Sequence, residues 1–393
     1  MRATVATPFL AVSNGHGEDL IAAEVIRHLE GVDAVAYPLV GLGQAYPPRV
    51  RLLDPRRVFP SGGFAFRDGL RGLSGDLRAG FVRFWLAQRR TLRAQRGCFA
   101  LAMAVGDPYC LAMALLAGAP TVLVASADSV LHAPYGPLPL RVLRRAVRVF
   151  TRDEPTAADL RRRGIPAAYL GNVMLDCLQP AVADFTVAAG RPVVTLLPGS
   201  RSDAPRNAAL LGEVAARIAR SRPDVQFLLS LAPTVEEETV LQALRRSTGS
   251  ARHSSGARTD PGAAPVEVGP ARLTFTRAFA PAVERADVVV GLAGTANEQA
   301  AGLGKPVVAF PGPGPQFTAR FLALQRHLLG EAIVAASNPD QAAAAVLQLL
   351  ASPQERARRG QAGRERMGAP GAAARVAAEI QRLLTGAPAG TGR

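Results

Sequence analysis

The most constraining feature of this sequence is the stretch Phe279 to Phe310, FAPAVERADVVVGLAGTANEQAAGLGKPVVAF. Its pattern predicts a helical segment, an apolar strand from Asp287 to Leu292, a tight turn at Ala293-Gly294-Thr295, a second helix from about Asn297, and a strand from Val307 to Phe310. A strand that passes through small residues into a helix leaves unpaired backbone N–H groups at the positive end of the helix dipole. Such a helix start is suited to binding a diphosphate.

The first turn of that second helix carries an acidic residue, Glu298. A carboxylate at this position can accept hydrogen bonds from the two neighbouring hydroxyls of a ribose while the helix start binds the phosphates. We therefore expect a nucleotide-binding turn around Gly294, Thr295 and Glu298.

The chain has 393 residues, enough for two domains that each have their own core. Apolar segments of strand length alternate with helical segments, which predicts an α/β fold with parallel, doubly wound sheets. In the first half we expect strands at Val5–Val12, Val32–Val40, Phe99–Val105, Thr121–Ala125 and Val147–Thr151, and helices at Glu18–Leu29, Leu70–Arg96, Tyr109–Ala117 and Pro155–Arg163. A loop with Pro134, Pro137 and Pro139 is expected before the last of these strands.

The second half repeats the same alternation. We expect strands at Val193–Leu197, Val225–Leu231, Leu273–Phe275, Val288–Leu292 and Val307–Phe310, and helices at Ala208–Arg220, Phe317–Leu329, Pro339–Leu350, Gln354–Arg364 and Ala372–Leu384. Residues 247–270 are rich in Ser, Gly, Ala and Pro, which predicts a flexible surface insertion. The predicted domains are residues 1–171 and 172–366, and residues 367–393 form a last helix and a disordered tail.

Ligands of parallel α/β sheets bind beyond the carboxyl ends of the strands, so the loops that follow strands are the candidate sites. The first such loop is Ser13–Asp19, SNGHGED. Gly15 and Gly17 allow the backbone to approach a ligand, and His16 lies at the end of the strand. The alternative is a structural turn in which Asn14 caps the helix.

Asp107 ends the apolar strand Phe99–Val105 and precedes Pro108. A partly desolvated carboxylate is a better general base near neutral pH than an exposed one. The alternative is that Asp107 only caps the helix that follows. Both roles remain open at this stage.

Arg201 follows Pro198-Gly199-Ser200 after the strand Val193–Leu197. An arginine beside a helix start can neutralise a departing diphosphate through bidentate hydrogen bonds. The alternative is an ordinary surface arginine. Gln316 and Phe317 follow the stiff turn Pro311–Pro315, where Gln316 is a candidate helix cap.

Three motifs resemble GT-B glycosyltransferases and, within that fold, lipid-A-disaccharide synthases and the proteins related to them. The motifs are GNVMLD at 171–176, PGSR at 198–201, and GTANE at 294–298 with GKPVV at 304–308. The resemblance covers nearly the whole chain and implies two Rossmann-like domains that face each other across a cleft. The clearest departure is NGHGED at 14–19, where the synthases carry a GEASGD-like loop, so their acceptor is not implied.

The resemblance also implies roles for individual residues. The C-terminal domain would bind a UDP-sugar, with the uracil near Ala278 and Phe279, although an apolar packing role is the preferred interpretation of Phe279. The donor contacts would be Ser200, Arg201, Ala278, Gly294, Thr295, Asn297, Glu298 and Gln316. The N-terminal domain would bind a lipid or lipid-like acceptor through Asn14, Gly15 and Gly17. Asp107 would be the general base, with His16 as the alternative base or as a phosphate ligand.

The predicted reaction is an inverting transfer of a sugar, expected to be a hexosamine, from a UDP-sugar to the acceptor. The sequence has neither a DxD carboxylate pair in a suitable loop nor a Cys/His cluster, so we expect no metal and no cofactor. UDP would then depart toward the helix start and Arg201. The alternatives are an isomerase similar to UDP-N-acetylglucosamine 2-epimerase and a nucleotide-sugar-binding protein without catalysis.

The formal net charge is +15, and Lys305 is the only lysine, so arginine supplies nearly all of the positive charge. A genome rich in G and C explains this bias; a basic face for an anionic lipid or a phosphorylated substrate is the alternative. No nucleic-acid-binding motif accompanies the charge, so we expect no nucleic-acid partner. Aromatic residues among the arginines predict either a domain core or contact with an anionic membrane; they are Phe59, Phe64, Phe66, Phe81, Phe84 and Trp85.

Cys98, Cys110 and Cys177 lack metal-ligand spacing and read as reduced core residues. The apolar run from Cys98 to Ala127 is interrupted by Asp107-Pro108 and Gly118-Ala119-Pro120, which predicts a buried strand–helix–strand unit. No signal peptide is apparent at the N-terminus. We expect a cytoplasmic protein, with the inner face of the cell membrane as a candidate site of peripheral contact.

Overall fold

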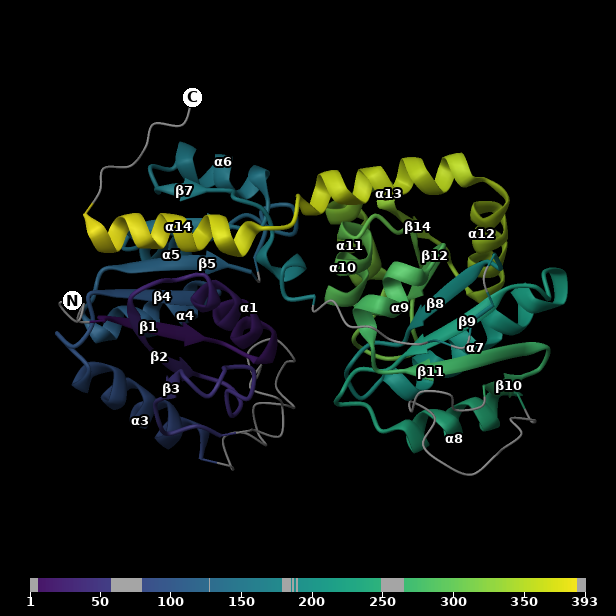
Figure 1. Ribbon diagram of the computed structural model, residues 1–393, viewed down its shortest axis with the longest axis horizontal. Helices are drawn as coiled ribbons and strands as arrows, with labels where there is room; N and C mark the ends of the chain where they lie inside the picture. Colours follow the sequence, from purple (N-terminus) through teal and green to yellow (C-terminus); the bar gives the residue numbers. More distant parts are fainter. Residues whose placement is uncertain are drawn as a thin grey trace, which may run out of the picture. The chain divides into compact units, whose positions relative to one another are not determined.

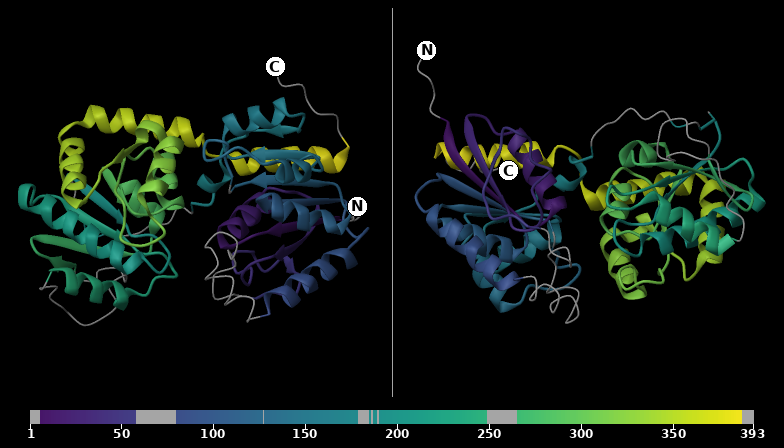
Figure 2. Two further views of the ribbon diagram at one scale, coloured as in Figure 1. Left: turned by 180° about the vertical axis from the view of Figure 1, so that it is seen from behind. Right: turned by 90° about the horizontal axis from the view of Figure 1, so that it is seen from below.

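The computed structural model describes residues 6–57, 80–126, 128–178, 185, 187–188, 190–248 and 265–386. Its internal contacts divide the chain into two compact units: unit 1 comprises residues 1–177 and 370–393, and unit 2 comprises residues 178–369. The sequence predicted the first boundary at 171–172. Each unit is a parallel-rich sheet with helices on both faces, as the views in Figures 1 and 2 show.

Unit 1 contains a sheet with strand order β3-β2-β1-β4-β5-β6-β7, in which neighbouring strands pair in parallel. The strands are β1 Thr7–Ser13, β2 Val32–Pro38, β3 Arg51–Leu52, β4 Leu101–Gly106, β5 Thr121–Ala125, β6 Arg148–Thr151 and β7 Ala167–Ala168. The helices are α1 His16–Arg27, α3 Phe81–Ala94, α4 Pro108–Ala114, α5 Pro137–Leu143, α6 Glu154–Arg162 and α14 Ala372–Thr385, with the 3-10 turns η1 Leu115–Ala117 and η2 Val173–Leu175.

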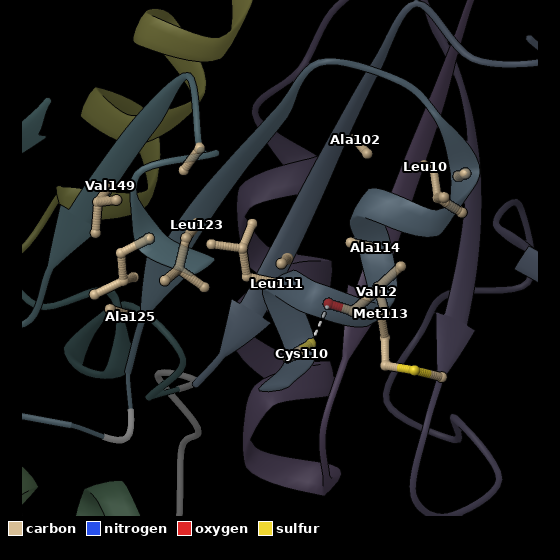
Figure 3. Close-up of a cluster of buried hydrophobic side chains, with 14 of the residues drawn as sticks. Leu10, Val12, Ala102, Cys110, Leu111, Met113, Ala114, Leu123, Ala125 and Val149 are labelled. Carbon is tan, nitrogen blue, oxygen red and sulfur yellow. Dashed lines mark hydrogen bonds between the residues drawn. The ribbon is translucent and has the colours of Figure 1, made fainter. Parts of the chain in front are cut away.

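The central strand β1 has apolar side chains on both faces because each face packs against helices. Leu10 and Val12 belong to one buried cluster, which includes Leu111 of α4 (Figure 3). Phe9 and Ala11 belong to a second cluster, which includes residues of α1 and α14. Successive side chains of a strand point to opposite faces, so a strand covered on both sides needs a continuous apolar run. This is why the first strand was readable from the sequence.

Helix α14 packs in unit 1 although it follows unit 2 in the chain. The carboxylate of Asp176 accepts hydrogen bonds at the start of this helix from the N–H groups of Gly371, at 2.5 Å, and Ala373, at 2.7 Å. Arg375 Nε donates to the carbonyl oxygen of Leu170 at 2.8 Å. The last residue of the GNVMLD motif therefore anchors a helix that lies far away in the sequence (Figure 1).

Unit 2 contains a sheet with strand order β10-β11-β9-β8-β12-β13-β14, parallel except for the β10–β11 pair. The strands are β8 Val193–Leu197, β9 Gln226–Ser230, β10 Val266–Val268, β11 Ala271–Thr276, β12 Val288–Gly291, β13 Val307–Ala309 and β14 Ile333–Ala335. The helices are α7 Ala204–Ser221, α8 Glu237–Thr248, α9 Phe279–Arg285, α10 Thr295–Gly302, α11 Ala319–Leu329, α12 Pro339–Ala351 and α13 Pro353–Met367, with the 3-10 turn η3 Gly330–Ala332.

The structure corrects two sequence-based expectations. The loop expected around Pro137 and Pro139 contains helix α5, which begins at Pro137. Proline is tolerated there because the first N–H groups of a helix have no partner within it. The insertion expected at 247–270 includes strand β10, which pairs with β11, while residues 249–264 lie outside the described part of the chain.

Other expectations fall partly or wholly outside the described residues. The helix expected at Leu70–Arg96 is observed as α3, Phe81–Ala94, and residues 58–79, with Phe59, Phe64 and Phe66, are not described. The tail at 387–393 is not described either. The strand–helix–strand unit expected within Cys98–Ala127 is confirmed as β4, α4 and β5. Among the helices that the structure describes, none combines the length and the apolar character needed to cross a bilayer.

Candidate functional site

The order of the strands places a candidate binding edge in each unit. In unit 2 the chain runs from β8 outward to β9 and β11, and then returns to the other side of β8 as β12 and β13. In such a sheet, ligands bind beyond the carboxyl ends of the two strands at which the direction reverses. Those strands are β8 and β12, and they are followed by the PGSR and GTANE motifs.

A glycine allows the two loops to meet at this edge. Gly199 has a φ of 93°, a backbone conformation that other residues rarely adopt. A Cβ at this position would lie 3.2 Å from the carbonyl oxygen of Leu292, the residue that follows β12. The loop after β8 can therefore pack directly against the loop after β12.

Arg201 and Gln316, which are 115 residues apart in the chain, are in direct contact. Arg201 Nη1 donates to Gln316 Oε1 at 2.7 Å, and both residues are at or near the surface. The backbone N–H of Gln316 donates to Asp203 Oδ2 at 3.2 Å. The two predicted donor contacts are thus brought together, and the loop after β13 is joined to the loop after β8.

Asn207 of α7, which is 3% exposed, also connects the loops after β8 and β12. Its Nδ2 donates to the carbonyl oxygens of Pro198, at 3.0 Å, and Leu292, at 3.5 Å. Its Oδ1 is buried and has no hydrogen-bond partner within the described part of the chain. The sequence analysis missed Asn207, although a polar residue on the apolar face of a helix, one turn before Leu211, is a signal that could have found it.

Helix α10 begins at this edge and its N-terminus has no side-chain cap. Gly294 precedes it, and Thr295, its first residue, is exposed. Gln325 of α11 donates to the carbonyl oxygens of Ala293, at 3.2 Å, and Gly294, at 3.0 Å, which holds the turn from the outer side. The first N–H groups of α10 therefore face a turn that is fixed by neighbouring elements, as an anion site requires.

The predicted donor contacts Asn297 and Glu298 of α10 are both buried. Asn297 is fully buried, and its Nδ2 donates to the carbonyl oxygen of Gly291 at 3.1 Å and to Gln325 Oε1 at 2.9 Å. This contact set makes Asn297 a positioning residue for the turn rather than a surface contact for a donor. Glu298 lies in the first turn of α10 and is 7% exposed.

The remaining donor candidates lie along the same edge. Ser200 is exposed, and its carbonyl oxygen accepts from Thr234 Oγ1 at 2.7 Å, which joins the loops after β8 and β9. Ala278 follows β11, is half-buried, and its N–H donates to Thr276 Oγ1 at 2.9 Å. Phe279, the first residue of α9, is also half-buried. Strand β9 separates β11 from β8, so Ala278 lies farther along the edge than the other candidates.

In unit 1 the direction of the chain reverses between β1 and β4. The loop after β1 holds Asn14, Gly15, His16 and Gly17, and the loop after β4 holds Asp107. A Cβ at Gly106 would lie 3.4 Å from Asn14 Cβ and 3.5 Å from Glu18 Cγ. The fold therefore brings the predicted acceptor loop next to the predicted base.

Asp107 is half-buried and is the N-cap of α4, with Oδ1 accepting from the N–H of Cys110 at 2.9 Å. The capping alternative is thus realised. A carboxylate has four acceptor positions, so capping through one oxygen is compatible with proton transfer through the other.

The cap of α1 is Gly15, not Asn14. Gly15 has a φ of 144°, and no side chain caps this helix, so the alternative in which Asn14 is the cap is wrong. His16 and Gly17 are exposed in the first turn, whereas Asn14 is half-buried. The loop consequently offers backbone N–H groups and an imidazole at the edge.

A buried polar cluster lies directly beneath this loop. Ser13 Oγ donates to Asp19 Oδ1 at 2.5 Å and is 2.6 Å from the hydroxyl of Tyr46. Burial raises the pKa of Asp19 to about 6, and the hydrogen bond from Ser13 opposes part of that rise. Burial also raises the pKa of Tyr46 well above its usual value. The sequence analysis missed this cluster, because Tyr46 joins it only through the fold.

The sequence predicts that no metal is bound, and the structure can be searched for metal-ligand clusters only over the described residues. Within 6–57, 80–126, 128–178 and the described parts of unit 2, no three His, Cys, Asp or Glu side chains are close enough together to hold a metal ion. The three cysteines are free thiols; Cys110 is buried and Cys177 is half-buried, but Cys98 is exposed, so its expected place in the core is wrong.

The sequence and the fold were compared with known proteins. No family model matches the chain. Over 154 residues it is 35% identical to lipid-A-disaccharide synthase of Azoarcus sp. (strain BH72), a match that covers 37% of this chain and 35% of the relative. The chain thus matches about a third of that relative's length. The motif-based resemblance to these synthases is confirmed over this part of the sequence.

Solved structures share the fold over almost the whole chain. The UDP-GlcNAc 2-epimerase from Neisseria meningitidis, solved bound to UDP-GlcNAc, is 14% identical with a TM-score of 0.58, covering 95% of this chain and 99% of its own. The calicheamicin glycosyltransferase CalG4 is 14% identical with a TM-score of 0.61, covering 98% and 99%. The chain therefore has the α/β fold of GT-B proteins, with two Rossmann-like domains.

Proposed function

We propose that this chain is an inverting glycosyltransferase that moves a sugar from a UDP-sugar to a lipid or lipid-like acceptor without a metal. The observation that carries the proposal is the joined edge of unit 2, where Arg201 and Gln316 meet beside the uncapped start of α10. A cation and free N–H groups together match the charge of a diphosphate leaving group. The sequence similarity to lipid-A-disaccharide synthases supports a glycosyl transfer.

In this proposal unit 2 binds the donor. The diphosphate accepts hydrogen bonds from the N–H groups around Thr295 and from Arg201, and Glu298 accepts hydrogen bonds from the ribose hydroxyls. Asn297 and Asn207 fix the backbone of the turn, so that the donors need not reorganise when charge develops on the departing oxygen. Arg201, Gln316 and Thr295 would face the anionic part of the donor.

Unit 1 supplies the base and the acceptor contacts. Asp107 takes the proton of the acceptor hydroxyl, whose oxygen attacks the anomeric carbon from the face opposite to UDP. The bond between the anomeric carbon and the diphosphate oxygen breaks, and UDP keeps the electron pair. His16 and the backbone at Asn14, Gly15 and Gly17 would position the acceptor, with His16 as the alternative base.

The base assignment is tested by Asp107→Asn, which keeps the cap of α4 but cannot take a proton. We expect loss of sugar transfer with UDP affinity unchanged, and Asp33→Asn, an exposed carboxylate on β2, is the matched control. Normal transfer by the Asp107 variant would show that another group is the base.

The ribose role is tested by Glu298→Ala. We expect UDP affinity to fall by about 1.5–3 kcal/mol, the value of hydrogen bonds to a charged group. Glu267→Ala, an exposed residue of β10 in the same unit, is the control. Equal affinity of both variants in calorimetry would exclude this role for Glu298.

A second candidate is an isomerase similar to UDP-N-acetylglucosamine 2-epimerase, because such an enzyme shares the fold over 95% of this chain, as glycosyltransferases also do. Incubation of the protein with UDP-N-acetylglucosamine alone discriminates the two functions. An epimerase would change the configuration at C2 without any acceptor, whereas a glycosyltransferase would leave the sugar unchanged until an acceptor is added.

We further propose that α3 contacts an anionic membrane on the cytoplasmic side. Val82 and Leu86 on this helix are 50% and 44% exposed, and Arg83, Arg90 and Arg93 are exposed as well. The guanidinium of Arg89 lies 4.4 Å from the ring centroid of Trp85. Apolar and cationic side chains together on one exposed helix are typical of peripheral membrane contact.

A further inference from the structure

Unit 2 has a cavity whose lining residues differ from those of the edge described above. Its volume is about 640 Å³, within the range of small-molecule sites. Helix α11, the turn η3, strand β14 and helix α13 form its walls. The lining residues are Ala323, Arg326, His327, Gly330, Glu331, Ile333, Val334, Ala335, Arg359 and Arg366.

The walls of this cavity carry more positive than negative charge. Arg326, His327 and Arg366 have no ion-pair partner among the residues that the structure describes. The nearby carboxylates already have partners: Glu331 pairs with Arg358, and Glu355 pairs with Arg358 and with Arg359 Nε at 2.8 Å. The guanidinium groups of Arg326 and Arg366 are therefore not neutralised by the protein itself.

The turn η3 sets the position of one of these cations. A Cβ at Gly330 would lie 3.0 Å from Arg366 Nε and 3.1 Å from its Nη2, so the guanidinium of Arg366 lies over the glycine backbone. Arg359 Nη1 donates to the carbonyl oxygen of Glu331 at 2.6 Å from the same wall. Arginines from α11 and α13 thus line one hollow, to which strand β14 also contributes Ile333, Val334 and Ala335.

We propose that this cavity binds a phosphate ester: a phosphate group held by Arg326 and Arg366, with an organic portion against the apolar residues of the lining. Two guanidinium groups that face one space repel each other, and a bound dianion reverses that repulsion while forming bidentate hydrogen bonds. The volume exceeds that of a bare phosphate, which favours an ester. A soluble phosphate ester and a phospholipid headgroup share this chemistry.

The test is calorimetric titration of the full-length protein with glycerol 3-phosphate, in the presence of saturating UDP so that the nucleotide edge is occupied. We expect saturable binding that weakens more than about tenfold in the Arg326→Gln/Arg366→Gln variant, because charge-assisted hydrogen bonds are lost. Arg220→Gln, which removes an exposed arginine from the last turn of α7, is the control and should bind like the wild type. Equal binding by the wild type and the double variant, or no saturable binding, would overturn the proposal.

A parallel arm distinguishes the two sources of the phosphate. Vesicles of phosphatidylglycerol and of phosphatidylcholine are sedimented with the wild type and with both variants. Selective loss of phosphatidylglycerol binding in the double variant assigns the cavity to a lipid headgroup, while unchanged sedimentation with lost glycerol 3-phosphate binding assigns it to a soluble ester. If the double variant melts early, Arg326→Gln alone answers the same question, since this side chain is exposed.

Discussion

Asp19 should make the stability of unit 1 depend on pH, and Asp19→Asn should remove that dependence. The carboxyl is 2% exposed, beneath the loop that holds His16. Burial raises its pKa from 3.8 to about 6 in the folded protein. The unfolded chain therefore loses this proton near pH 4, whereas the folded chain keeps it until about pH 6.

The direction and size of the effect follow from these two values. Below about pH 4 both states are protonated and Asp19 imposes no ionisation penalty. As the pH rises from about 4 to 6 the folded state binds more protons than the unfolded state, so the free energy of unfolding falls. Each pKa unit corresponds to about 1.4 kcal/mol, so the loss reaches about 3 kcal/mol above pH 6. An asparagine cannot ionise, and its oxygen can still accept from Ser13.

We therefore expect Asp19→Asn to stabilise unit 1 at pH 8 by about 1–3 kcal/mol relative to the wild type, with the difference vanishing near pH 4. The only tryptophan of the chain, Trp85, lies in α3 of unit 1, so its fluorescence in urea titrations reports this unit separately. Asp33→Asn, an exposed carboxylate on β2, is the control. A stability difference between Asp19→Asn and the wild type that stays the same from pH 4 to pH 8, or destabilisation by the variant at pH 8, would refute this account of the buried carboxyl.

Three further substitutions test the geometry. Gly199→Ala should weaken UDP binding and lower the free energy of unfolding of unit 2 by about 1–3 kcal/mol, because a φ of 93° is strained for alanine. Calorimetry measures both the UDP affinity and the unfolding, and unchanged values would contradict the contact between the two loops. Gly363→Ala should destabilise unit 2 by about 1–3 kcal/mol, because its Cβ would lie 2.2 Å from the carbonyl oxygen of Ala301 and would push α13 away from α10. Scanning calorimetry should show a lower unfolding temperature of unit 2 while the Trp85 fluorescence transition of unit 1 stays unchanged. A shift in both transitions would contradict this explanation. Leu86→Gln on α3 should reduce sedimentation with phosphatidylglycerol vesicles several-fold, whereas Leu138→Gln, 69% exposed on α5, should not; equal effects of the two would exclude a specific role of α3.

The regular part of the fold was predictable because its signals are local. The strand Val193–Leu197 and the strand Thr121–Ala125 were predicted with the bounds that the structure has, since both are short apolar runs between turn residues. Helix α5 was missed because its prolines read as a loop, although a helix start tolerates them. Strand β10 was missed because the composition of residues 247–270 predicts a flexible segment, whereas pairing with β11 makes Val266–Val268 a strand.

The candidate site divides in the same way. The positions of Gly294 and Thr295 at a helix start were predictable because a strand, a small turn and a helix follow one another in the sequence. Their proposed role in binding a diphosphate stays a prediction, as does that of Arg201. That Arg201 meets Gln316, that Asn297 turns inward to Gly291 and Gln325, and that Tyr46 completes the cluster of Ser13 and Asp19 required the tertiary structure. These contacts join residues that are distant in the chain, and burial and hydrogen-bond partners are properties of the packed fold rather than of any segment. The sequence alone determined where a strand, a small turn and a helix start follow one another, and only packing decided which side chains support that turn and which remain at the surface.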